Sequence, residues 1–115
     1  MLLERGDVVL VAHRRLFEGD EARYFIGRVE GYDAGIIKVA GRSYARDLVS
    51  GELVGKADER VKLVALGSGT VLVYQLPGEV APERLAFRIA DDETWLEDGA
   101  GFRMNLTEAP RGGRM

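Results

Sequence analysis

Short runs of β-branched and apolar residues, each closed by a glycine or a polar turn, follow one another along most of this chain, and no segment keeps a helical period. The sequence contains 15 glycines and only 3 prolines. Glycines spread through a sequence that is not of low complexity are typical of tight turns and bent strands. The 115 residues suffice for one domain with a single core. The pattern therefore predicts one mostly-β domain.

The apolar runs place the expected strands. The first begins apolar on both faces and turns basic at its end. In the second, Tyr24 and Ile26 share one face and Val29 has the other, which predicts a bend or bulge at Gly27. Residues 45–59 predict a long loop with room for a short strand. The expected strands are residues 8–16, 22–32, 36–44, 60–66, 70–76, 85–89, 94–97 and 102–106, with a short helix over residues 92–97 as the alternative there.

Charge and composition narrow the classes of function. The net charge is -3, with acids and bases mixed along the chain, whereas a general nucleic-acid-binding surface is normally basic. The chain has no cysteine, which excludes disulfides and thiolate metal sites. No apolar run approaches the roughly 20 residues that span a bilayer. Residues 1–7 lack the layout of a signal peptide. We expect a cytoplasmic protein without membrane contact.

Two glycine-rich stretches carry a resemblance to a known family. Residues 27–37 read GRVEGYDAGII, and residues 65–73 read ALGSGTVLV. Their order and spacing resemble the two motifs of the Sm/LSm family, and the resemblance covers about residues 7–77. It implies a small, strongly bent five-stranded Sm-like barrel, for which the glycines supply the bends.

The resemblance also divides the chain. Residues 1–78 are expected to form the Sm-like barrel. Residues 79–109 are expected to form a C-terminal β extension packed on or beside it, and residues 110–115 a disordered tail.

The last two strands of the expected barrel are the expected oligomer interface. In the Sm/LSm family these strands pair edge to edge with neighbouring subunits and close a ring. Residues 60–76 are apolar and lightly charged here, and such an edge needs a cover. A homo-oligomer would supply it. The C-terminal extension could cover the edge instead, or the pair could lie buried in a monomer. The expected interface residues are Val61, Leu63, Val64, Val71 and Val73.

The family's RNA-binding groups are largely missing. Carried over by the resemblance, the base-stacking position falls on Gly35, the base-reading asparagine on Ile37, and the supporting arginine on Leu66. None of these three can stack on a base or hydrogen-bond its edge through a side chain. Asp33 retains the family residue, and Lys38 is the nearest polar replacement.

A basic group near the end of the first strand is the other candidate for nucleic-acid contact. His13, Arg14 and Arg15 follow one another, and Arg23 is expected across the hairpin. They form either a small phosphate-contacting patch or a solvated strand end. With Asp33 and Lys38 they complete the predicted nucleic-acid residues.

No group of residues indicates catalysis. A lone histidine supplies at most one metal ligand, and no serine or acid is identifiable as its partner. We therefore expect no enzymatic activity, no metal and no cofactor. The expected function is a non-catalytic, ring-type oligomeric binding module, with RNA as the partner that the resemblance implies. The alternative is a structural or protein-interaction module that binds no nucleic acid.

Overall fold

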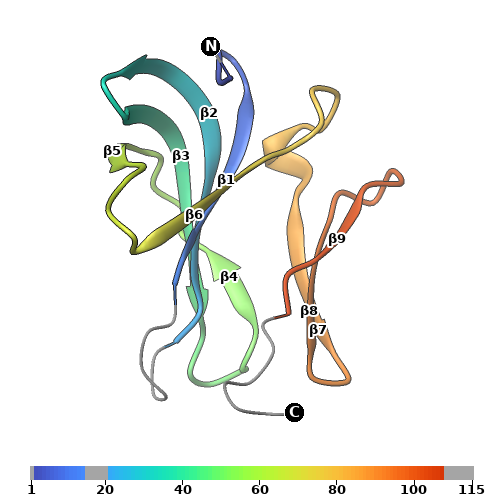
Figure 1. Cartoon of the computed structure of the whole chain (residues 1–115). Coiled ribbons are helices and arrows are strands. Elements are labelled where there is room, and N and C mark those ends of the chain that lie inside the picture. The colour runs from blue at the N-terminus through green and yellow to red at the C-terminus, as the bar shows by residue number, and fades with distance from the viewer. Residues whose placement is uncertain (1, 15–20, 108–115) are drawn as a thin grey trace, which may run out of the picture.

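The computed structural model describes residues 2–14 and 21–107, which form two antiparallel sheets (Figure 1). This confirms the predicted mostly-β fold. Within the described part of the chain, no helix could cross a membrane. The elements are β1 (Val8–His13), β2 (Arg23–Asp33), β3 (Ile36–Arg46), β4 (Leu53–Gly55), β5 (Arg60–Ala65), β6 (Val71–Gln75), the short 3-10 helix η1 (Pro82–Arg84), β7 (Ala86–Ala90), β8 (Glu93–Glu97) and β9 (Arg103–Asn105).

The first six strands form one strongly curled sheet, called the curled sheet below. Its order is β4-β3-β2-β1-β6, and β5 also pairs with β3. The long strand β3 pairs with β5 along its first half and with β4 along its second half. The curl brings β5 and β6 toward one another from opposite edges (Figure 1). The expected closed barrel does not form among the described residues, because β5 and β6 do not pair. Side chains of the concave face lie between them.

Both faces of the curled sheet are buried. In β2, Tyr24 and Ile26 belong to the core cluster on the convex face, while Phe25 and Val29 belong to the cluster on the concave face. The predicted change of face at Gly27 is therefore wrong, because the alternation continues through it. The irregularity in the β2–β3 register lies later, between Val29 and Gly31.

Gly27 has a different role. It lies directly opposite Gly41 of β3. A Cβ atom on Gly27 would collide with the Ala40 carbonyl oxygen, and one on Gly41 would collide with the Ile26 carbonyl oxygen. The two paired strands approach so closely at this point that only glycine fits on either side.

The C-terminal sheet, of order β7-β8-β9, covers the convex face of the curled sheet. The Phe87 ring stacks on Tyr24, with centroids 4.8 Å apart, and meets the edge of Tyr44 at 5.1 Å. The interior between the sheets is apolar. Its buried members are Val8, Leu10, Tyr24, Ile26, Leu53, Leu76, Val80, Leu85, Leu96 and Leu106.

The C-terminal strands settle two expectations. The helix considered for residues 92–97 is wrong, because residues 93–97 form β8 and pair with β7. Asp91 and Asp92 are the two residues of the hairpin turn, with φ of 53° and 64°, and aspartate tolerates this left-handed conformation better than most residues. The short strand allowed for in the loop is β4. Arg15 and the tail at 110–115 lie outside the described residues.

A candidate binding cleft between two strand edges

An apolar cleft of about 260 Å³ opens on the concave side of the curled sheet, between β5 and β6. We call it the seam cleft. Its floor is the concave core cluster, which includes Phe25 and Val64. The turn that joins β5 to β6 closes one end, where the Ser68 and Thr70 hydroxyls lie 2.9 Å apart. The lining residues are Val11, His13, Phe25, Lys62, Leu63, Val64, Ala65, Ser68, Thr70 and Val71.

One wall of the cleft is a strand edge without a partner in the described chain. β5 pairs only with β3. The Leu66 amide, just beyond β5, donates to the Gly35 carbonyl at 2.8 Å. In an antiparallel ladder, every second residue bonds directly across. Val61 and Leu63 therefore direct their backbone N–H and C=O groups away from β3, toward the open edge.

The other wall has the same property. β6 pairs only with β1 among the described strands, and the Leu76 amide donates to the Val8 carbonyl at 2.9 Å. By the same alternation, the backbone groups of Val71 and Val73 point away from β1. Their side chains lie half-buried against the concave core. The cleft is thus flanked by two edges that can each accept a further strand.

The five expected interface residues are distributed unevenly. Val61 and Leu63 are 55% and 72% exposed on the outer side of β5. Val71 and Val73 are half-buried, and Val64 is buried in the concave core. A partner strand on β5 would meet the first two side chains directly.

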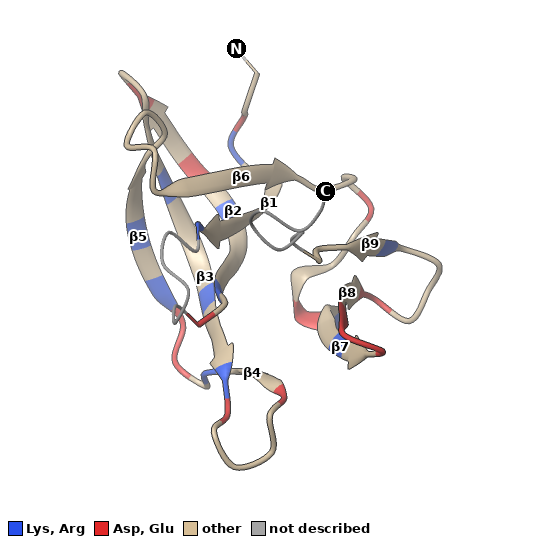
Figure 2. Ribbon diagram, turned by 60° about the horizontal axis from the view of Figure 1, so that its bottom comes forward, with Lys and Arg blue, Asp and Glu red and all other residues tan. Residues whose placement is uncertain are grey.

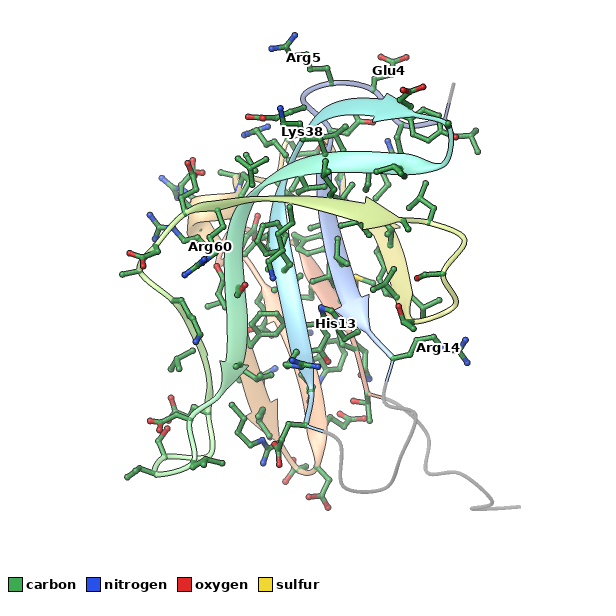
Figure 3. All side chains as sticks on the ribbon, turned by 90° about the vertical axis from the view of Figure 1, so that its left-hand side faces the viewer. Glu4, Arg5, His13, Arg14, Lys38 and Arg60 are labelled. Carbon is green, nitrogen blue, oxygen red and sulfur yellow. The ribbon has the colours of Figure 1, made fainter. Side chains whose placement is uncertain are left out.

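Cationic side chains from several strands flank the cleft on the side of His13, which pairs with Val71 at the start of β6. His13 ends β1, Arg23 begins β2, and Arg60 and Lys62 alternate along one face of β5. The Lys62 Nζ atom lies 4.8 Å from the centroid of the Phe25 ring. Figure 2 shows the basic bands on β5, and Figure 3 looks onto this side, with His13 between Arg60 and Arg14. We call His13, Arg14, Arg23, Arg60 and Lys62 the basic end.

The electrostatics of His13 reflect this gathering. Burial lowers the pKa of its imidazole, and the positive charges of Arg23 and Lys62 lower it further. Burial is the larger cause, and the two nearby cations further disfavour protonation of the ring. Arg14 is held nearby, because its Nη1 donates to the Gly69 carbonyl at 3.1 Å.

The candidate nucleic-acid residues do not form one surface. Asp33 and Lys38 lie by the β2–β3 turn, whereas His13, Arg14 and Arg23 lie at the opposite end of the curled sheet (Figure 3). Arg15 is outside the described residues.

The positions aligned with the family's uridine pocket do come together. Gly35 and Leu66 are hydrogen-bonded neighbours, and Ile37 lies opposite Val64. Ile37 is completely buried in the concave core. Gly35 has φ of +83° in the β2–β3 turn, a conformation that disfavours any larger side chain there. Neither position presents a group to a base.

Sequence reasoning missed Arg60 and Lys62 as site residues. They were treated as part of a lightly charged, apolar strand, although their alternation with Val64 places all three on one face. That alternation was a usable signal. What it could not show is that the curl carries this face toward His13 and Arg23, which lie 37 to 49 positions earlier in the chain.

A second groove, of about 270 Å³, lies on the other face beside η1. It exposes Arg28 and Arg42 together with Glu59 and Glu83, so its charges are of both signs.

No cluster of three or more potential metal ligands occurs in residues 2–14 and 21–107. Comparisons with family models, with curated proteins and with solved structures found no match. The seam cleft differs from the second groove because its lining is mostly apolar and two strand edges flank it.

Proposed function

We propose that this protein is a non-catalytic assembly module whose copies join through the edges of β5 and β6. The observation that carries the proposal is the pair of unpartnered strand edges, with Val61 and Leu63 exposed beside one of them. An edge of this kind is a template for another strand. Each copy offers two different edges, so β5 of one copy pairs with β6 of the next. Such a head-to-tail contact produces a ring if its rotation closes.

The proposal includes an Sm-like form of the curled sheet. Two features support it: the two motif segments meet at Gly35 and Leu66, and the strands formed by residues 60–76 are two of the three edge strands of the curled sheet, β4 being the third. In the Sm/LSm family these strands make the ring contact. The form without uridine recognition has the better support, because Gly35 has no side chain and Ile37 is buried.

The test is the mass in solution by light scattering over a range of concentrations. We expect the wild type to exceed the 12.7 kDa of one chain. Val61→Lys places a charge beside the β5 edge and should return the mass to that of one chain. Val49→Lys is the matched control, because Val49 is 95% exposed in the loop between β3 and β4. It should behave as the wild type.

Two results would contradict the proposal. One is a wild-type protein that stays at 12.7 kDa at the highest concentration tested. The other is an oligomer that Val61→Lys and Val49→Lys leave equally intact. Circular dichroism of both variants confirms that the fold is retained, as expected for substitutions at exposed positions.

A further inference from the structure

The cations of the basic end form no ion pair with a described residue, in residues 2–14 and 21–107. Within the described residues, the ion pairs join Arg46 to Glu21, and Arg88 and Arg103 to Glu97. None involves a member of the basic end. Its cations come from β1, β2 and β5, and they lie together although the chain as a whole has a net charge of -3. A local positive field on an acidic protein attracts anionic partners to that place.

The part of the seam cleft next to the basic end further restricts which ligands can bind. Its lining is mostly aliphatic, from residues such as Val11, Val64 and Val71. A ligand that fills the cleft and reaches the basic end must therefore combine an apolar part with an anionic part. In a copy whose β6 edge is not paired with a neighbour, the backbone groups along β6 add hydrogen-bonding positions that suit a peptide. In the assembly, β5 of the next copy occupies these groups, and the side chains of the cleft and the basic end remain as the recognition groups.

Single-stranded nucleic acid fits this arrangement less well. Its recognition relies on exposed aromatic faces on which bases stack. Two aromatic rings line the cleft. Phe25 is 1% exposed and covered by the Lys62 ammonium, and the His13 imidazole is partly buried. Tyr32, which is 43% exposed, ends β2 far from His13.

We propose that the seam cleft binds an acidic peptide segment of a partner protein. An apolar side chain enters the cleft between Val64 and Val71, and the carboxylates that follow it pair with Arg23, Lys62 and His13. This goes beyond self-assembly, because β5 of a second copy carries Arg60 and Lys62 and no acidic residue. A neighbouring copy paired along its β5 therefore brings no carboxylate of that strand to the basic end.

The test uses a fluorescein-labelled peptide in which a short run of valine is followed by a short run of glutamate. Fluorescence anisotropy at low salt measures its binding to the full chain. We expect binding that weakens as salt is added. A peptide with glutamine in place of glutamate should bind at least about tenfold more weakly, since it cannot form charge-assisted hydrogen bonds. Equal binding of the two peptides would overturn the proposal.

Variants locate the site. Arg23→Gln and Lys62→Gln should each weaken binding about fivefold, the upper range for an exposed ion pair. Arg84→Gln, in η1, is the matched control and should leave binding unchanged. An equal loss in all three variants would mean that only the overall charge matters, and would also overturn the proposal. So would a labelled oligouridine that binds more tightly than the acidic peptide.

Self-assembly can be separated from peptide binding. Val61 does not line the seam cleft, so Val61→Lys should keep its affinity for the peptide even where it lowers the mass. Conversely, Lys62→Gln should keep the oligomer mass while losing affinity. If Val61→Lys abolished peptide binding while the Gln variants did not, the peptide would be recognised by the assembly and not by the basic end.

Discussion

The two faces of the curled sheet are buried by different means. The convex face is covered by the chain's own C-terminal sheet, and the interior there is apolar and closed. The concave face is covered by the curl of the sheet itself, which stops short of closing at β5 and β6. The chain thus completes one side of its core and leaves an apolar cleft, two strand edges and a group of cations on the other. A covered face contributes stability, whereas an incompletely covered one offers a place for a partner.

The largest difference between the two sides should appear on truncating leucines. Leu96 is completely buried between the sheets, whereas Leu63 is 72% exposed beside the cleft. We expect Leu96→Ala to lower the free energy of unfolding by about 3 kcal/mol, and Leu63→Ala to change it by less than about 0.5 kcal/mol. Urea denaturation at concentrations where the chain is monomeric measures both. Similar losses would mean that the C-terminal sheet contributes little to the core.

The close approach of β2 and β3 at Gly27 and Gly41 belongs to the sheet between the two faces, and glycine variants test it. Gly27→Ala should lower the free energy of unfolding by about 2–3 kcal/mol, because the new methyl group meets the backbone at Ala40. Gly31→Ala in the same strand is the control, since its Cβ atom would meet nothing within 4 Å. Thermal unfolding compares the two. Equal stabilities of the two variants would show that β2 and β3 can move apart at Gly27 at little cost in free energy.

The smallest expected effect is on the protonation of His13, which lines the seam cleft. Its pKa is lowered below the ordinary 6.5, first by burial and then by Arg23 and Lys62. As the only histidine in the chain, it can be followed by NMR without assignment of other imidazoles. Lys62→Gln should raise this pKa. Bound acidic peptide should raise it too, because a carboxylate favours the imidazolium.

The sign of the effect on stability follows by linkage. Between the lowered pKa of the folded chain and about 6.5, the unfolded chain binds more protons than the folded one. The free energy of unfolding therefore decreases as the pH falls through about 6.5, and stops changing on this account once His13 is protonated in both states. A midpoint of denaturation that rose on acidification across this range would contradict the placement of His13.

The strands were predictable because their signals are local. The apolar runs at residues 60–66 and 70–76 correspond closely to β5 and β6. The face change at Gly27 was mispredicted for a physical reason. In a sheet buried on one face, apolar residues occupy one parity, but β2 is buried on both, so Tyr24 and Val29 can both be core residues without a bulge between them.

The candidate site was only partly predictable. Val61 and Leu63 were expected at an interface, and they are exposed beside an open edge. The basic end was recognised only as far as His13, Arg14 and Arg23, which are close in sequence. Arg60 and Lys62 join them through the curl of the sheet, and the strand pairing that sets this curl depends on contacts distant along the chain.

The sequence by itself determined the alternation of apolar and polar positions and the turns, because each depends on a few neighbouring residues, and it determined the absence of cysteine. Tertiary structure decided whether the sheet closes, which face the C-terminal sheet covers, and which charges meet. These outcomes depend on packing between distant strands, and a shift of one residue in register would exchange the faces of an entire strand. The cleft between β5 and β6 therefore exists only in the folded chain.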